Sequence, residues 1–176
     1  MDRTKEIMTA RDIERTLDRL ACQILEQIPD HESIALVGIQ RRGADLAARL
    51  CGLLAARTGR SHPCGELDIN LYRDDWTSST ATPNINATRI DFSVEDKAII
   101  LIDDVLFTGR TIRCALEAIL DFGRPQSVKL LVLVDRGHRE LPIQADFVGK
   151  TVATERGQQV NVFLQERDGR DQVLLG

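Results

Sequence analysis

The chain has 176 residues, with 23 Lys and Arg against 27 Asp and Glu, which gives a formal net charge of −4. With 43% hydrophobic and 28% charged residues, the composition is typical of a globular domain and excludes a largely disordered chain. The longest apolar runs, at 98–102 and 130–134, are too short to span a membrane, and the first thirty residues lack the apolar core of a secretory signal. We therefore expect a cytoplasmic protein that forms a single domain over 1–176.

The N-terminal third of the chain predicts a helix, a strand and a second helix. Thr9 precedes Asp12 by three residues, which is the spacing of a capping box, and apolar residues then recur at helical intervals until Pro29 ends the run. The continuous apolar run at 34–39 predicts a buried parallel strand. Apolar residues at helical spacing after Gly43 predict the second helix.

The middle of the chain contains a strand followed by an unusual polar stretch. Apolar and polar residues alternate over 66–72, which predicts a strand. The stretch 73–88 is rich in Ser and Thr and has no periodicity. Connections of this length in compact domains are usually functional lids or disordered segments.

The C-terminal half continues the alternation of strands and helices. Buried strands are predicted over 97–102 and 128–134, with a helix over 111–122 between them. Shorter strands are expected near 147–148 and over 160–165. The order of these elements predicts an α/β fold with a largely parallel central sheet flanked by helices.

The four cysteines do not form a metal-binding motif. They are far apart, without C-x-x-C spacing and without a His at an interval typical of zinc sites. Three of them lie in predicted helices, where we expect small buried thiols: Cys22, Cys51 and Cys114.

The clearest chemical signal lies in 99–111, which reads IILIDDVLFTGRT. A buried strand ends in Asp103 and Asp104, and the turn 108–111 then opens a helix. Open parallel sheets bind ligands beyond the carboxyl ends of their strands, and a helix N-terminus offers unpaired N–H groups to a phosphate. Paired carboxylates accept hydrogen bonds from vicinal hydroxyls. The pattern therefore favours a phosphorylated ribose.

The turn itself is suited to an anion. The hydroxyls of Thr108 and Thr111 are additional donors, and Gly109 allows the backbone to approach the phosphate closely. Neither the P-loop motif nor the dinucleotide-binding fingerprint occurs in the chain. The alternative is an ordinary connection between a strand and a helix, with an Asp pair on the surface.

Segment 99–111 resembles the 5-phosphoribosyl-1-pyrophosphate (PRPP) binding motif of type I phosphoribosyltransferases. The segments 68–75 (DINLYRDD) and 133–143 (LVDRGHRELPI) resemble the bifunctional pyrimidine operon attenuator and uracil phosphoribosyltransferase family, and the resemblance runs from about residue 11 to about residue 165. It implies the type I phosphoribosyltransferase fold, with 73–88 as a mobile hood loop. It also implies Mg²⁺ as cofactor and the conversion of uracil and PRPP to UMP and pyrophosphate.

The resemblance assigns roles to individual residues. Asp103, Asp104 and Arg42 are the implied catalytic residues, and the acidic pair is expected to contact the metal indirectly, through water or the ribose hydroxyls. The residues implied in PRPP and phosphate binding are Arg41, Arg42, Arg73, Asp103, Asp104, Val105, Thr108, Gly109, Arg110 and Thr111.

The segment Gly38–Gly43 occupies the position of the family's pyrophosphate loop. Two adjacent guanidinium groups suit a pyrophosphate because each can form forked hydrogen bonds. The family usually has Thr where Arg41 stands, so the binding role falls more safely on Arg42. A solvated Arg pair is the alternative. The family also implies a non-proline cis peptide within 40–42.

The base is expected beyond the third buried strand, where Asp135 and Arg136 are the implied binding residues. His138 is a candidate general base, although uracil N1 could also release its proton to a phosphate oxygen or to water. Orotate or a purine is the alternative base. The residues after Val134 offer no aromatic side chain to stack on a purine.

The second functional hypothesis is an attenuator that binds pyrimidine operon mRNA leaders, senses UMP or UTP, and has little or no catalysis. The cationic candidates for RNA contacts are Arg19, His138, Arg139 and Lys150. Asp18, Cys22 and Gln144 stand where RNA-binding members tend to have uncharged polar or basic groups, and the net charge of −4 also argues against it. The family implies a homodimer or a higher homo-oligomer.

Overall fold

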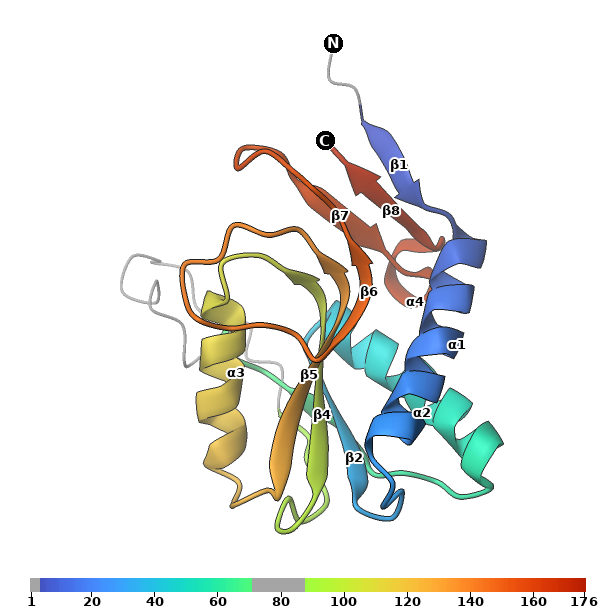
Figure 1. Cartoon of the computed structure of the whole chain (residues 1–176), viewed down its shortest axis with the longest axis vertical. Helices are drawn as coiled ribbons and strands as arrows, with labels where there is room; N and C mark the ends of the chain where they lie inside the picture. Colours follow the sequence, from blue (N-terminus) through green and yellow to red (C-terminus); the bar gives the residue numbers. More distant parts are fainter. Residues whose placement is uncertain (1–3, 71–87) are drawn as a thin grey trace.

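The computed structural model describes residues 4–70 and 88–176. Its centre is a parallel sheet in the order β3-β2-β4-β5-β6. Helices α1 and α2 cover one face of this sheet and α3 covers the other (Figure 1). The bounds are α1 Ala10–Gln27, β2 Ile34–Ile39, α2 Arg42–Thr58, β3 Cys64–Leu67, β4 Ala98–Leu106, α3 Arg110–Leu120, β5 Ser127–Asp135 and β6 Phe147–Thr151. The predicted α/β architecture is confirmed.

A second, antiparallel sheet has the order β1-β8-β7 and lies near both ends of the chain (Figure 1). Its strands are β1 Lys5–Met8, β7 Val160–Phe163 and β8 Gln172–Leu175, with the short helix α4 Gln165–Asp168 before β8. The sequence did not predict β1, α4 or β8. Each has four residues, and one helical turn or two strand repeats are too few to show a periodicity.

Helix α1 begins as predicted. The Oγ1 atom of Thr9 accepts a hydrogen bond from the backbone of Asp12 at 3.2 Å, and Asp12 Oδ2 accepts one from the backbone N–H of Thr9 at 2.9 Å. Both halves of the capping box are therefore present. The apolar face of the helix is buried on the sheet at Ile13, Leu17, Leu20 and Ile24.

Strand β4 is four residues longer at its carboxyl end than predicted and includes the acidic pair. The ladder to β5 continues through Asp103↔Val132 and Leu106↔Asp135, so pairing with the neighbouring strand keeps the chain extended. The prediction that the strand ends before Asp103 is therefore wrong, although the pair does lie near the carboxyl end of the central strand.

Strand β3 begins earlier and ends earlier than predicted. It runs only to Leu67, because Asp68 Oδ1 accepts a hydrogen bond from the backbone of Asn70 at 2.9 Å and turns the chain. The residues that follow Asn70, from 71 to 87, lie outside the described part of the chain, so most of the expected hood loop at 73–88 lies there too.

The continuous apolar strands are buried on both faces. In β4, Ile100 and Ile102 pack towards α1 and α2, whereas Ile99 and Leu101 pack towards α3.

The prediction for the cysteines is only partly correct: Cys114 is buried and Cys51 half-buried, but Cys22 lies on the exposed side of α1. Among the described residues, no helix is long and apolar enough to cross a membrane.

Candidate active site

The acidic pair lies at the carboxyl end of β4, between β2 and β5. The Asp103 side chain is buried and Asp104 is half-buried. Asp103 Oδ1 accepts from the backbone N–H of Asp104 at 2.9 Å, and Asp104 Oδ1 accepts from that of Val105 at 2.8 Å. Burial, followed by the charge of Asp104, raises the pKa of Asp103 well above its usual value. A donor or cation facing the pair would stabilise it.

The start of α3 is open to an anion. Gly109 has φ +91°, a left-handed conformation that favours glycine, and as the N-cap residue it offers no side chain to cap the helix. The hydroxyl of Thr108 lies 3.4 Å from the backbone N–H of Arg110, while Thr111 is exposed. The helix dipole and the N–H groups at the start of a helix are those expected of a phosphate site.

The loop between β2 and α2 contains a cis peptide bond between Gln40 and Arg41, as expected within 40–42. Two glycines allow the loop to pack against β4. A Cβ atom on Gly43 would lie 2.4 Å from the carbonyl oxygen of Ile102 and 3.2 Å from the Asp103 Cα, and one on Gly38 would lie 2.3 Å from the Gly43 oxygen. Direct packing of Gly43 on Asp103 therefore brings the 40–42 loop beside the acidic pair.

The two loop arginines have different surroundings. Arg41 is exposed, whereas Arg42 is half-buried at the first residue of α2. The Nη2 atom of Arg42 donates to Asp168 Oδ1 at 3.1 Å, and its buried Nε has no hydrogen-bond partner among the described residues. The backbone N–H of Leu164, and to a lesser extent Arg42, lowers the pKa of Asp168.

The loop after β5 is stabilised by its own charged side chains. Asp135 accepts from the backbone of Gly137 at 3.0 Å and from Arg139 at 2.5 Å. The Arg136 guanidinium is buried 4.0 Å above the Phe107 ring and donates to the carbonyl oxygen of Glu155 at 3.1 Å. Arg136 therefore links the loops that follow β4, β5 and β6.

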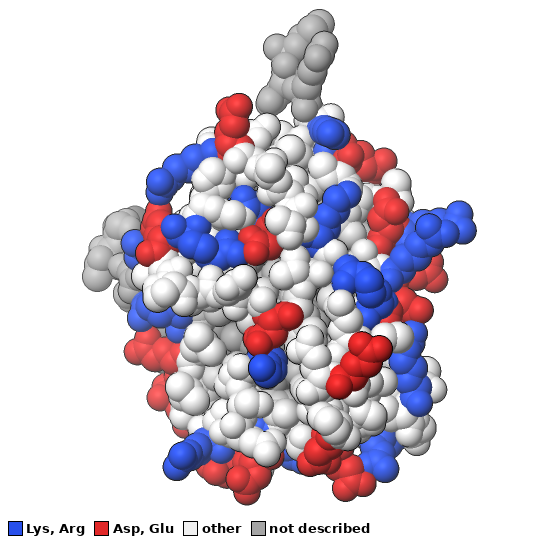
Figure 2. Space-filling view, viewed as in Figure 1, with Lys and Arg blue, Asp and Glu red and all other residues white. Residues whose placement is uncertain are grey.

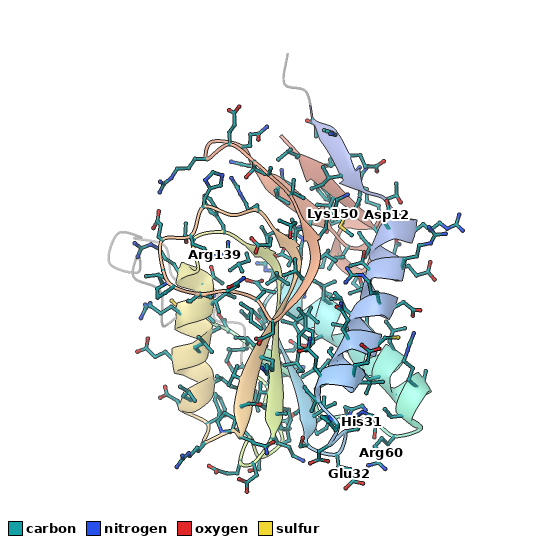
Figure 3. All side chains as sticks on the ribbon, viewed as in Figure 1. Asp12, His31, Glu32, Arg60, Arg139 and Lys150 are labelled. Atoms are coloured by element: carbon teal, nitrogen blue, oxygen red, sulfur yellow. The ribbon has the colours of Figure 1, made fainter. Side chains whose placement is uncertain are left out.

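His138 and Arg139 both bond to backbone carbonyls. His138 Nε2 lies 2.7 Å from the carbonyl oxygen of Thr154, and because a carbonyl only accepts, Nε2 carries the proton and only Nδ1 is left to act as a base. Arg139 donates to the carbonyl oxygens of Phe107 and Ile143, both at 2.9 Å. Arg139 is labelled in Figure 3, in the loops beside α3.

A cavity of about 540 Å³ lies beside this loop. It is lined by residues 135–139, Ile143, Gln144 and residues 151–154, which follow β5 and β6. Backbone groups at these strand ends and the Nδ1 atom of His138 offer both donors and acceptors. The cavity is therefore suited to a planar ligand with polar edges, such as a nucleobase.

The remaining cationic candidates lie beside β6. Arg19 of α1 donates to the carbonyl oxygen of Gly149 at 2.6 Å, and Lys150 donates to that of Ile7 at 2.7 Å. Figure 3 shows Lys150 next to Asp12 at the start of α1, on the opposite side of the view from Arg139. The RNA candidates therefore form two groups. Arg73, the remaining predicted phosphate ligand, lies outside the described residues.

Three residues to which the sequence assigned no role complete the site. Glu140 accepts from Arg110 at 2.8 Å and so fixes a side chain of the phosphate turn. The Phe107 ring packs against the Arg136 guanidinium, and Asp168 forms an ion pair with Arg42. Phe107 and Glu140 lie within the motif segments 99–111 and 133–143, but no motif in the sequence connects Asp168 to a residue 126 positions away.

No group of three His, Cys, Asp or Glu side chains that could hold a metal ion occurs in residues 4–70 and 88–176. The carboxylates of Asp103 and Asp104 are nevertheless the hard oxygen ligands that Mg²⁺ prefers. Because Mg²⁺ keeps water and substrate oxygens in its coordination shell, the acidic pair fits a magnesium ion that arrives with a phosphorylated substrate.

Comparison with known proteins identifies closely similar sequences. Residues 3–165 match the model of the phosphoribosyl transferase domain. The chain is 52% identical to the "Bifunctional protein PyrR" of Thermus thermophilus over 97% of its own length and 94% of that protein. It is 49% identical to the protein of the same name from Caldicellulosiruptor bescii, over 99% of its own length and 96% of that protein.

Solved structures share the fold at lower sequence identity. A hypoxanthine phosphoribosyltransferase from Trypanosoma cruzi in a ternary substrate complex superposes with a TM-score of 0.74 at 22% identity, covering 98% of this chain and 95% of that one. One from Staphylococcus aureus gives a TM-score of 0.68 at 22% identity, covering 96% and 90%. At these identities the likeness concerns the fold and carries no information about the base.

Proposed function

This chain belongs to the phosphoribosyltransferase family, and we propose that it transfers the phosphoribosyl group of PRPP to uracil, forming UMP and pyrophosphate. One observation carries the proposal: Gly43 packs on Asp103, so the acidic pair lies beside the Arg41–Arg42 loop, and the strand that holds the pair leads within a few residues to the start of α3. PRPP has the three groups that these elements suit: a pyrophosphate, a ribose diol and a 5′-phosphate.

Each element binds one part of PRPP. The N–H groups and hydroxyls of 108–111 bind the 5′-phosphate. Asp103 and Asp104 accept hydrogen bonds from the ribose 2′- and 3′-hydroxyls, and Arg42, supported by Arg41, binds the pyrophosphate. Mg²⁺ held by the substrate and, through water or the hydroxyls, by the acidic pair would neutralise charge on the pyrophosphate.

In the reaction, the bond between uracil N1 and the ribose C1 carbon forms as the bond from C1 to the pyrophosphate oxygen breaks. The pyrophosphate leaves with the electron pair, and the N1 proton passes to a phosphate oxygen or to water. Asp103 and Asp104 stabilise the positive charge that develops on the sugar ring. Because His138 donates Nε2–H to the Thr154 carbonyl, its Nδ1 is the only atom through which it could take this proton.

The base pocket is the cavity beside the loop after β5. Backbone groups near Asp135 and Arg136 read the uracil edge, while the buried guanidinium of Arg136 keeps the 155–156 turn in place. With hypoxanthine or orotate as acceptor, turnover should be far below that with uracil. If turnover with hypoxanthine or orotate equals or exceeds that with uracil, that base and not uracil is the substrate.

The test is UMP formation from labelled uracil and Mg-PRPP. The Asp104→Asn variant should reduce kcat/KM about a hundredfold, because the lost charge stabilises the transition state. Asp91→Asn, which removes an exposed carboxylate elsewhere, should leave it unchanged. If the wild-type chain binds PRPP or UMP without turnover, the attenuator alternative with little catalysis replaces this proposal.

A second function rests on the cations around β6. Lys150 and Arg19 lie together there, and the relatives carry the name "bifunctional". We propose that this group contacts the phosphates of a pyrimidine operon mRNA leader, with UMP or UTP as the signal bound in the active site. The protein is expected to act as a homodimer or a higher homo-oligomer, which light scattering would measure.

A further inference from the structure

One face of α2 is paired with the segment 166–171, which comprises most of α4 and the turn after it. Arg42, Asp45 and Arg49 are spaced by three and four residues, so they project from one side of the helix. Their partners come from this segment alone in the described residues: Asp168 for Arg42 at 3.1 Å, Arg167 for Asp45, and Glu166 and Asp171 for Arg49 at 2.6 and 2.7 Å.

The same segment contacts the pyrophosphate loop in two places. Arg167 donates to the carbonyl oxygen of Arg41 at 3.4 Å, and both carboxylate oxygens of Asp168 lie within 3.4 Å of Arg42 Nη2. The contacts therefore reach the loop that is proposed to bind the leaving group.

Arg42 requires an anion where it stands. It is the first residue of α2, where the positive end of the helix dipole disfavours a cation. Asp168 supplies the anion, and its own position is fixed because Oδ2 accepts from the backbone N–H of Leu164 at 2.8 Å. The Asp168 side chain is only 20% exposed, and the backbone N–H of Leu164 lowers its pKa, so it remains charged at neutral pH.

We propose that Asp168 is a positioning residue that holds the Arg42 guanidinium in the geometry that binds pyrophosphate. Only Nη2 faces Asp168, and the buried Nε of Arg42 has no partner in the described part of the chain. The Arg42 side chain is still 35% exposed, so a pyrophosphate oxygen can reach the accessible part of the guanidinium while Asp168 keeps its plane fixed. The inference rests on the proposed function, since it assigns Arg42 to the leaving group.

Asp168→Asn and Asp171→Asn form a matched pair of variants. Each aspartate accepts a backbone N–H, from Leu164 and Gln165 respectively, and each pairs with an arginine of α2. Asparagine keeps an acceptor oxygen for the N–H, removes the charge, and replaces the second carboxylate oxygen by an NH2 group that cannot accept from the arginine. A purely structural role of the segment would give both variants the same kinetics, whereas positioning affects Asp168→Asn alone.

The measurements are KM for PRPP, KM for uracil, and inhibition by pyrophosphate. In Asp168→Asn, the KM for PRPP and the inhibition constant of pyrophosphate should each rise about tenfold, with the KM for uracil within twofold of wild type. Asp171→Asn should match wild type in all three. Arg42→Ala combined with Asp168→Asn should be no worse than Arg42→Ala alone.

Two results would overturn the inference while leaving the proposed function in place. Equal constants in Asp168→Asn and wild type would mean that the pair is only structural. Tighter pyrophosphate binding in Asp168→Asn would mean that Asp168 competes with the ligand for Arg42. Absence of turnover in the wild-type chain would instead refute the proposed function, and direct binding of pyrophosphate by calorimetry would still test Asp168.

Discussion

At the scale of single residues, the distance between α2 and β4 depends on the absence of a side chain. Gly43 lies against the backbone of Ile102 and Asp103, where a Cβ atom would overlap a carbonyl oxygen. Arg42, one position earlier, owes its place near the acidic pair to this contact. The site therefore depends on a glycine as much as on its charged side chains.

Gly43→Ala should lower the free energy of unfolding by about 1 to 3 kcal/mol and reduce activity, because α2 must move away from Asp103. Gly52→Ala is the control within the same helix. It meets no atom within 4 Å, so it should stabilise the protein by about 0.5 to 1 kcal/mol without loss of turnover. Urea unfolding and the uracil assay measure both effects, and equal behaviour of the two variants would contradict the packing argument.

At the scale of elements, the four-residue helix α4 is stabilised by its contacts with α2. Arg49 bonds to Glu166 through Nε and Nη2 and to Asp171 through Nη1 and Nη2. The hydrogen bonds from Arg49 are the main cause that lowers the pKa of both carboxylates. A helix this short has almost no stability of its own, so its several contacts with α2 together hold it in place.

This network predicts a pH dependence. A carboxylate whose pKa is lowered on folding stabilises the protein above its unfolded pKa, and that contribution is lost as the pH falls through the folded value. Replacing Arg49 by Met should cost roughly 1 kcal/mol at pH 7. The difference from wild type should shrink as the pH falls below the ordinary values of 4.5 for Glu166 and 3.8 for Asp171.

Thermal unfolding at pH 7 and pH 3 measures the effect. Arg60→Met is the control, because its partner Glu32 is 76% exposed and an ion pair in solvent contributes little at either pH. A difference between Arg49→Met and wild type that persists unchanged at pH 3 would assign the cost to packing of the arginine stem.

The elements that sequence reasoning recovered are those with a strong local signal. The apolar runs of β2, β4 and β5 and the capping box at Thr9 are visible in short windows, and they identified the fold and the acidic pair. The continuation of β4 to Leu106 depends on pairing with β5, and the Arg42–Asp168 contact joins distant segments. Such long-range contacts leave no periodicity in the sequence.

At the scale of the whole molecule, charge is distributed without a dominant sign. Figure 2 shows positive and negative side chains interspersed in small groups over the face drawn, and the net charge is −4. Non-specific attraction to a polyanion is therefore weak. RNA binding would have to depend on a few local cations such as those around β6.

The Lys150→Gln variant should weaken binding of a pyrimidine operon leader transcript. Because the variant removes one phosphate-binding cation, the slope of log K against log salt concentration should become shallower by about 0.7 to 0.9. Lys129→Gln is the control, because Lys129 pairs with Asp146 near the other end of the sheet. Filter binding over a salt series measures the slopes. Equal salt slopes for the Lys150 and Lys129 variants would mean that the RNA binds another part of the protein.

The pairing of β1 with β8 has a consequence for how the chain matures during synthesis. Lys5 pairs with Leu175, so the first described strand finds its partner only after every strand of the central sheet has been translated. All five strands of the parallel sheet precede α4 in the chain, and β8 follows α4 directly. The residues of the central sheet are therefore synthesised before those that anchor Arg42. Binding of pyrophosphate would then require residues that are made after every strand of the central sheet.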